Sequence, residues 1–147
     1  MSTLETVEIK AFVPAKDFAL SKAFYIALGF ELRSEFHDIA YFCAGSCAFL
    51  LQDFYRPAHA HNMVMHLVVK DVQAWFDKVK ACDFPARYKE IGVKVMPLQI
   101  QPWGMTEFVV IDPCGVCWHI AQNTPNFEPV GRISSGNSVA NTAASAS

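Results

Sequence analysis

The sequence predicts an α+β fold built from two copies of one module, in which a strand and a helix precede three further strands. Two alignments of the chain with itself predict it. Residues 13–30 lie over residues 67–84 without a gap, at a constant offset of 54. The segment "YFCAGSCAFLLQ" lies over "IDPCGVCWHIAQ", with Gly45 on Gly115 at an offset of 70. Two copies of so long a repeat indicate fused modules that share one core, and not a solenoid.

The first copy begins with an apolar strand that ends in Lys16 and Asp17. Asp17 is a suitable N-cap, because a short carboxylate accepts hydrogen bonds from the free amides of a helix's first turn. The helix that follows carries Leu20, Phe24 and Leu28 on one stripe at helical spacing. Three strand-like runs then cover residues 30–36, 39–45 and 47–54.

The second copy repeats this order. Asp71 takes the place of Asp17, and the apolar side of the predicted helix is formed by Val72, Trp75, Phe76 and Val79. The strands expected after this helix lie within residues 87–100, 106–112 and 116–122. The two offsets differ by 16 residues, which we expect in or near the first hairpin of this copy and its Pro-Trp-Gly loop.

The bulk composition limits the classes of function. The chain has 147 residues, 52% of them hydrophobic, and a formal net charge of −2. It has neither a basic stripe for nucleic acid nor an acidic block for a cationic partner. The longest nearly apolar run, residues 39–51, is shorter than the roughly 20 residues that a transmembrane helix needs. We therefore expect no nucleic-acid partner and no membrane.

Domain organisation follows from the repeat and from a change in composition. We expect one domain over residues 1–127, with modules at about 5–56 and 62–125. Residues 128–147 are small, polar and low in complexity, which predicts a flexible tail. The first ten residues lack the basic lead and apolar core of a secretion signal. Together with an odd number of cysteines, five, this predicts reduced thiols and a cytoplasmic location.

Three stretches carry a resemblance to a known family. They are "VPAKDFALSKAFYIALGF", "VVKDVQAW" and "QPWGMTEFVVIDPCGVCWHIAQ". In this order, they resemble the glyoxalase / bleomycin-resistance / extradiol-dioxygenase (vicinal oxygen chelate) superfamily, and the last is similar to the W-G-x-x-x-F…D-P-x-G…Q ending of its bleomycin-resistance-like branch. The resemblance covers roughly residues 7–125. It implies two βαβββ modules whose mixed sheets curl into an open barrel around a cavity, and it implies a homodimer.

In metal-using members of that family, each module contributes one ligand from its first strand and one from its last. The corresponding positions in this chain are Lys10, Phe49, Val64 and His119. A catalytic metal needs about three neutral or anionic ligands, and this set offers one imidazole beside an ammonium and two hydrocarbons. The resemblance therefore implies a member that binds a ligand without a metal or other cofactor, rather than one of the family's enzymes.

His119 occupies one of these positions, so it is expected to face the cavity, with Cys117 on the same side of its strand. It either contacts a bound molecule or is a buried histidine bonded to a neighbouring group. His66, two residues after Val64, is expected to meet His119 across the cavity. The two imidazoles and the thiolate of Cys117 are an alternative metal site outside the family pattern, against the simpler interpretation of pocket histidines.

Cys114 and Cys117 form a C-x-x-C pair of the kind that binds zinc or cycles as a disulfide. Zinc would need a second pair, and Cys43 and Cys47 lie at the matching turn of the other module. A redox pair usually opens a helix after a strand, whereas this one straddles a predicted β-turn. We therefore interpret the spacing as coincidence.

Trp103 lies between a proline and a glycine, where a large aromatic residue indicates a stacked ligand more than a strand core. The alternative is a lid that packs on the barrel. Trp118 is expected to point away from the side of His119, and Trp75 to pack in the core.

The other half of the cavity is expected to be lined by Lys10, Phe12, Phe49 and Leu51. Tyr41 maps onto Ile111 and is expected at the cavity rim. Lys10 either meets an anionic group of the ligand, forms a salt bridge with Glu107, or extends to solvent.

Three classes of function remain open. The favoured class is a metal-free, resistance-type protein that sequesters a small, partly aromatic molecule. Its expected ligand-binding residues are Trp103, His119, His66, Lys10, Phe49 and Tyr41. The alternative is a lyase- or isomerase-type enzyme of the same superfamily, with His119 or His66 as general base and Lys10 stabilising an enolate. The third is a structural or regulatory partner domain with a filled cavity.

Overall fold

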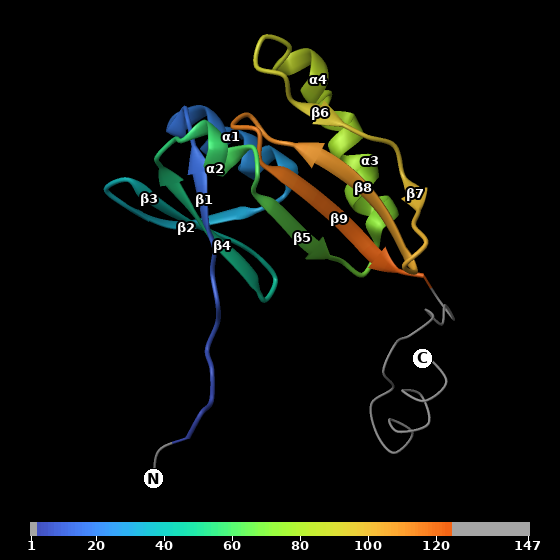
Figure 1. Cartoon of the computed structure of the whole chain (residues 1–147), viewed down its shortest axis with the longest axis horizontal. Helices are drawn as coiled ribbons and strands as arrows, with labels where there is room; N and C mark the ends of the chain where they lie inside the picture. Colours follow the sequence, from blue (N-terminus) through green and yellow to red (C-terminus); the bar gives the residue numbers. More distant parts are fainter. Residues whose placement is uncertain (1–2, 125–147) are drawn as a thin grey trace.

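The computed structural model describes residues 3–124, so the tail predicted at residues 128–147 lies outside the described residues. Figure 1 shows two β-sheets with helices packed along them. The sheets do not close on each other, which confirms the predicted α+β architecture with an open, curled arrangement.

The first sheet has four strands in the spatial order β1-β4-β3-β2. Their bounds are β1 Phe12–Ala15, β2 Glu31–Phe36, β3 Ile39–Ala44 and β4 Cys47–Asp53. β1 runs parallel to β4, and the other two pairs are antiparallel. Helix α1, Phe18–Leu28, connects β1 to β2. The three strand runs expected after the first helix are thus confirmed to within one residue.

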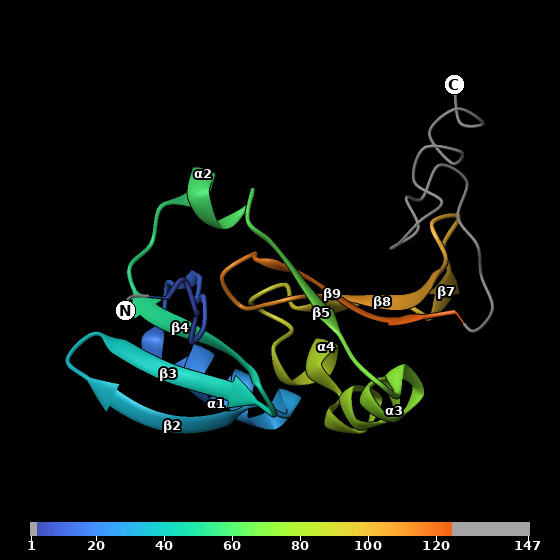
Figure 2. The same ribbon diagram turned by 90° about the horizontal axis from the view of Figure 1, so that it is seen from below.

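The second sheet follows the order β5-β9-β8-β6, and β7 also pairs with β8. The strands are β5 Val64–Val68, β6 Lys94–Val95, β7 Gln99–Ile100, β8 Met105–Ile111 and β9 Cys117–Asn123. β5 runs parallel to β9, as β1 does to β4. Helix α3, Val72–Cys82, follows β5, and a short helix α2, Pro57–Ala60, lies in the connector between the sheets. Figure 2 shows α3 and the short helix α4, Phe84–Arg87, on the same side of the second sheet.

The strand-like run expected within residues 87–100 is only partly extended. Residues Phe84–Arg87 form α4, with Pro85 in its first turn, and turns follow at residues 88–92. Only β6 and β7 are extended, and each is two residues long. Pro97 lies between them and cannot donate to a β-ladder, which accounts for the interruption. The second copy is therefore longer between its helix and its second long strand.

Both predicted N-caps are confirmed. Asp17 Oδ1 accepts a hydrogen bond from the Leu20 amide at 3.1 Å, and Asp71 Oδ1 accepts one from the Ala74 amide at 3.0 Å. These bonds satisfy first-turn donors that would otherwise lack partners. No helix in the described part of the chain is long and apolar enough to cross a membrane.

One core joins the two sheets. Tyr25 of α1 lies 5.6 Å from Trp118 of β9, measured between ring centroids. The Trp118 indole donates to the Tyr25 hydroxyl at 2.8 Å, and that hydroxyl donates to the carboxylate of Asp112. Phe24 of α1 packs on Phe84 of α4, with 4.7 Å between ring centroids. Because α1 precedes β2 in the first sheet, these contacts fix the second module against the helix of the first.

The two hairpins before the last strands differ in length, and the difference changes the register. Ala44 pairs with Cys47 across a turn of two residues, whereas Ile111 pairs with Cys117 across the five residues 112–116. Phe12 pairs with Leu50, and its repeat partner His66 pairs with His119. Leu50, and not Phe49, is therefore the structural counterpart of His119.

The segment before β1 leaves the first sheet. Leu4, Val7 and Ile9 are 98%, 99% and 95% exposed. In Figure 1 this segment extends away from both sheets. Apolar side chains at such exposure lack any partner within residues 3–124, which suits a contact with another surface.

Candidate functional site

The second sheet has one face without a covering helix. Val64, His66 and Val68 of β5 point to this face and are exposed. Their partners on β9 are Cys117, His119 and Ala121. Because cross-strand partners share a face, the two strands present valines, histidines and a thiol together. We call this surface the open face of the second sheet.

His119 is held on the open face by a buried carboxylate. Its Nδ1 lies 2.7 Å from Oε2 of Glu107, which is on the neighbouring strand β8. The Glu107 side chain is 3% exposed, whereas the His119 side chain is 32% exposed. A carboxylate only accepts, so Nδ1 carries the hydrogen of this bond, and in the neutral imidazole Nε2 is then an acceptor. His119 can therefore present an oriented acceptor, or a base, to a molecule on the open face.

His66 lies beside His119 on the neighbouring strand of the same sheet, and not across a cavity from it. Their ring centroids are 6.5 Å apart and the rings are nearly perpendicular, at 87°. No group of three or more His, Cys, Asp or Glu side chains within residues 3–124 is arranged to hold a metal ion. The alternative metal site of His66, His119 and Cys117 is thus not assembled in the described chain.

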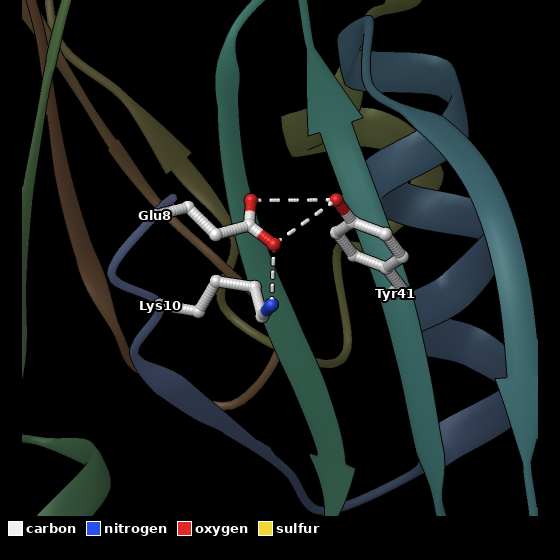
Figure 3. A network of polar contacts seen from close by, with 3 residues as sticks. All are labelled: Glu8, Lys10 and Tyr41. Atoms are coloured by element: carbon white, nitrogen blue, oxygen red, sulfur yellow. Dashed lines mark hydrogen bonds and ion pairs between the residues drawn. The ribbon is translucent and has the colours of Figure 1, made fainter. Parts of the chain in front are cut away.

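Lys10 and Tyr41 form a second cluster, on the face of the first sheet opposite α1 (Figure 3). Lys10 Nζ is 2.5 Å from Oε1 of Glu8, and the Tyr41 hydroxyl lies 3.4 Å from both Glu8 oxygens. The Lys10 ammonium is also 5.1 Å from the Tyr41 ring centroid. The hydrogen bond with Lys10 lowers the pKa of Glu8 and raises the pKa of Lys10. The predicted salt bridge of Lys10 with Glu107 is wrong, because each of the two has a different partner.

Phe49 does not lie with Lys10 and Tyr41. It is 1% exposed and packs 5.0 Å from Tyr25 and 5.2 Å from Trp118, between ring centroids. Leu51, two residues along, is also fully buried. Phe49 and Leu51 were expected to line the cavity together with Lys10, on an offset of 70 that assumes equal turns. The register instead separates Phe49 from Lys10, and Phe49 lines a pocket of about 290 Å³ together with His66.

Leu50, which pairs with Tyr41, takes the place that was predicted for Phe49. This register also places Tyr41 opposite Leu50 as Val109 stands opposite His119, so Ile111 is not the counterpart of Tyr41. The family's metal positions still hold no ligand in the first module, because leucine replaces phenylalanine in the set.

Trp103 lies at the tip of the β7–β8 hairpin and is half-exposed. Val109, the cross-strand partner of His119, is six residues further along the chain. Four of these steps lie within β8, which begins at Met105, and at about 3.3 Å per residue they span roughly 13 Å. Trp103 therefore lies before the start of β8, whereas His119 pairs with a residue in the second half of that strand.

The cysteines are free thiols within the described residues. Cys114 and Cys117 flank the β8–β9 turn, as predicted, and not a helix start. Burial raises the pKa of Cys114 to about 11, and burial with the charge of Glu107 raises the pKa of Cys117. Zinc binding and disulfide exchange both use the thiolate. A raised pKa disfavours that form, which agrees with a coincidental C-x-x-C spacing.

Glu107 is the site residue that sequence reasoning assigned to the wrong partner. It lies in the strand predicted at residues 106–112, and counting back from the turn would have placed it near His119.

Asp112 was missed as well. Its Oδ1 accepts from the backbone N–H groups of Cys114 and Val116, both at 2.8 Å, and its other oxygen accepts from Tyr25. Nothing in the spacing connects Asp112 to a helix 87 residues earlier.

Proteins of known structure share this fold. A model of the Glyoxalase/Bleomycin resistance protein/Dioxygenase superfamily matches residues 8–120. A bleomycin-binding protein from Streptomyces verticillus, in complex with copper(II)-bleomycin, is 23% identical, with a TM-score of 0.67 over 80% of this chain and 97% of its own. TnmS3, an antibiotic-binding protein from Streptomyces sp. CB03234, is 21% identical, with a TM-score of 0.62 over 83% of this chain and 100% of its own.

A lactoylglutathione lyase from Agrobacterium tumefaciens is 17% identical, with a TM-score of 0.55 over 80% of this chain and 95% of its own. A search of curated protein sequences gives no match. At these identities the solved structures share the fold with this chain, and they include both ligand-binding proteins and an enzyme.

Proposed function

This chain belongs to the Glyoxalase/Bleomycin resistance protein/Dioxygenase superfamily, and from that membership we propose that it sequesters a small, partly aromatic molecule without a metal. The observation that carries the proposal is the bond between Glu107 and His119 on an otherwise apolar, uncovered sheet face. Two neighbours that are named as bleomycin- or antibiotic-binding proteins support a binding role.

The open face of the second sheet sets the chemistry of the ligand. Val64 and Val68 offer apolar surface for an aromatic or aliphatic body. His119 Nε2 accepts a hydrogen bond, so the ligand group that meets it is a hydroxyl, an N–H or a protonated amine. His66 adds a second polar contact beside it. A ligand with a flat apolar body and one hydrogen-bond donor fits this surface.

We further propose that the protein acts as a homodimer. Leu4, Val7 and Ile9 are nearly fully exposed, and Ile100 is exposed on the second sheet. A contact between copies would bury these side chains and could bring Trp103 of one copy near His119 of the other. Light scattering should give twice the chain mass, and Val7→Glu with Ile9→Glu should give a monomer. A monomeric wild type would refute this part.

Free thiols favour a reducing, cytoplasmic compartment.

The binding role is tested by ligand titration of the full chain. Bleomycin and a panel of aromatic antibiotics are titrated with calorimetry and tryptophan emission as readouts. For any ligand that binds, His119→Ala should weaken affinity at least about tenfold, which corresponds to about 1.4 kcal/mol. Lys80→Ala, an exposed control on α3 at the helix-covered side of the second sheet, should leave it unchanged. Equal affinity of wild type and His119→Ala would place the ligand elsewhere.

Two further readouts test the remaining details of the proposal. Trp103→Ala should weaken binding if Trp103 stacks on the ligand, and unchanged affinity would remove it from the site. Elemental mass spectrometry of untagged protein should find no bound metal. One metal ion per chain would contradict metal-free binding.

The same pair of residues favours a second candidate, a lyase- or isomerase-type enzyme. A carboxylate that fixes the Nδ1–H tautomer leaves Nε2 as a base, which is the arrangement of a positioned general base. The test is turnover of a methylglyoxal–thiol adduct and of epoxides by wild type and His119→Ala. Turnover that disappears in His119→Ala would establish catalysis, and the absence of histidine-dependent turnover would exclude this candidate for those substrates.

A further inference from the structure

A separate cavity lies at the seam between the two modules, and none of its lining residues belongs to the open face of the second sheet. Its volume is about 460 Å³. Small-molecule sites usually have about 300–1,000 Å³. It is formed by the end of β1, the loops on either side of α2, the turn before β6 and the β8–β9 turn. We call it the seam pocket, and its lining residues are Lys16, Tyr55, His61, Ile91, Gly92, Lys94, Ile111, Asp112, Pro113, Cys114 and Gly115.

Three basic side chains from separate segments converge on the seam pocket. They are Lys16 after β1, His61 after α2 and Lys94 in β6. Within residues 3–124, neither lysine has a carboxylate within ion-pairing distance. The Lys16 ammonium is 5.2 Å from the centroid of the Tyr55 ring. Two ammonium groups without a carboxylate partner in a concave site attract an anion.

Asp112 is the one carboxylate among the lining residues, and it cannot neutralise the lysines. It is 2% exposed. One of its oxygens accepts from the Tyr25 hydroxyl, and the other accepts from two backbone N–H groups of its own turn. The two lysines are therefore the charged side chains on the accessible part of the wall.

His61 is fixed in the wall by close packing on a glycine. Gly115 has a φ of +96°, and a Cβ at this position would overlap the His61 ring, with Nε2 only 2.9 Å away. Only glycine combines this backbone conformation with this approach. His61 is exposed, and its ring lies against the β8–β9 turn. The close approach holds an imidazole at the edge of the pocket.

From this convergence of Lys16, Lys94 and His61 we propose that the seam pocket binds a small phosphate monoester. Such a group carries about −1.5 to −2 charges at neutral pH, which matches two ammonium groups. Lysines bind phosphate as point charges, and the imidazole N–H of His61 adds a directed donor. Tyr55 and Ile91 provide apolar wall for the organic part of the ester. The site is independent of the open face and of the proposed sequestration.

Phenyl phosphate is the probe, because it combines the phosphate monoester with an aromatic body. It is titrated into the full-length protein by calorimetry, up to about 10 mM, the range of weak binding. Wild type should bind it, and Lys16→Ala and Lys94→Ala should each weaken the affinity about five- to tenfold. Lys70→Ala, the matched control, should bind as wild type does. Circular dichroism and melting confirm that each variant is folded.

Three results would overturn the proposal. The first is no binding of phenyl phosphate by wild type. The second is equal affinity in wild type and in the folded Lys16→Ala, Lys94→Ala double variant. The third is equal affinity for benzoate, which would show that the pocket does not select a dianion. His119→Ala separates the two sites, because it should leave phenyl phosphate binding unchanged while it weakens binding on the open face.

Discussion

The two modules share one chain order and differ in the turn before the last strand. β3 and β4 meet in a two-residue turn at Gly45 and Ser46, whereas five residues separate β8 from β9. Both turns carry a glycine, so the sequences align there, yet the paired strands are out of step by one residue. In a strand, one residue exchanges the faces of every side chain that follows. Turn length, and not the position of the glycine, therefore sets which side chains of the last strand of each module point to the uncovered face of its sheet.

The uncovered faces of the two sheets also differ. On the first, Glu8 and Lys10 form an exposed pair beside Tyr41. On the second, Glu107 is buried and holds His119 at 2.7 Å. An exposed ion pair is screened and mobile, whereas a buried carboxylate fixes the orientation of its partner. Only the second face therefore presents a side chain with a defined direction for a ligand.

The largest expected effect tests the register. Phe49→Ala removes a buried ring that packs on Tyr25 and Trp118, so it should lower the free energy of unfolding by about 3–5 kcal/mol. Leu50→Ala, on the partly exposed opposite face, should cost about 1 kcal/mol or less. Urea unfolding at neutral pH measures both. A larger cost at Leu50 would restore the offset of 70 and break the comparison.

The next effect tests the two turns. Asp112→Ala leaves two buried backbone N–H groups without their acceptor, so it should lower the free energy of unfolding by about 2–3 kcal/mol. Ser46→Ala, the matched change in the exposed two-residue turn, should stay within about 0.5 kcal/mol of wild type. Urea unfolding again gives both values. Similar losses in the two variants would mean that the turns contribute equally.

Asp112 also predicts a pH dependence. Burial raises its pKa to about 6 in the folded protein, although the hydrogen bond from Tyr25 and those from the backbone oppose the increase. The unfolded value is about 3.9. A carboxyl with a raised folded pKa destabilises the fold above that pKa, and the cost disappears as the pH falls toward the unfolded value. Between pH ~7.5 and ~4.5, wild type should gain about 2 kcal/mol relative to Asp112→Asn. A difference that does not change with pH would contradict the raised pKa.

Much of the fold follows from the sequence because local signals carry it. Asp17 and Asp71 cap helices, and the three strands of the first module need only apolar alternation and short turns. The region between α3 and β8 does not follow, because Pro85 and Pro97 interrupt an apolar pattern that otherwise resembles a strand. Two prolines interrupt the local pattern there. How the neighbouring residues then fold depends on packing against the rest of the chain.

The candidate site follows from the sequence only within one module. His66 and His119 were predicted together because each shares a strand face with one of the family's ligand positions, and the structure pairs them on neighbouring parallel strands. The partner of Lys10 was not predicted, since it depends on how the segment before β1 lies over Tyr41. Trp103 was expected near His119 because both lie in one sequence motif. In the structure, strand β8 lies between them along the chain.

The smallest expected effect compares the two carboxylates on the uncovered faces. Glu107→Ala removes the buried partner of His119, and it should lower the free energy of unfolding by about 1 kcal/mol. Glu8→Ala, whose pair with Lys10 is exposed, should leave the urea midpoint unchanged. Imidazole ¹⁵N spectra give a second readout, since wild-type His119 should be the Nδ1–H tautomer and Glu107→Ala a mixture of both. A single Nδ1–H tautomer in both proteins would show that Glu107 does not orient His119, and the open face would then lack the fixed acceptor that distinguishes it from the first sheet.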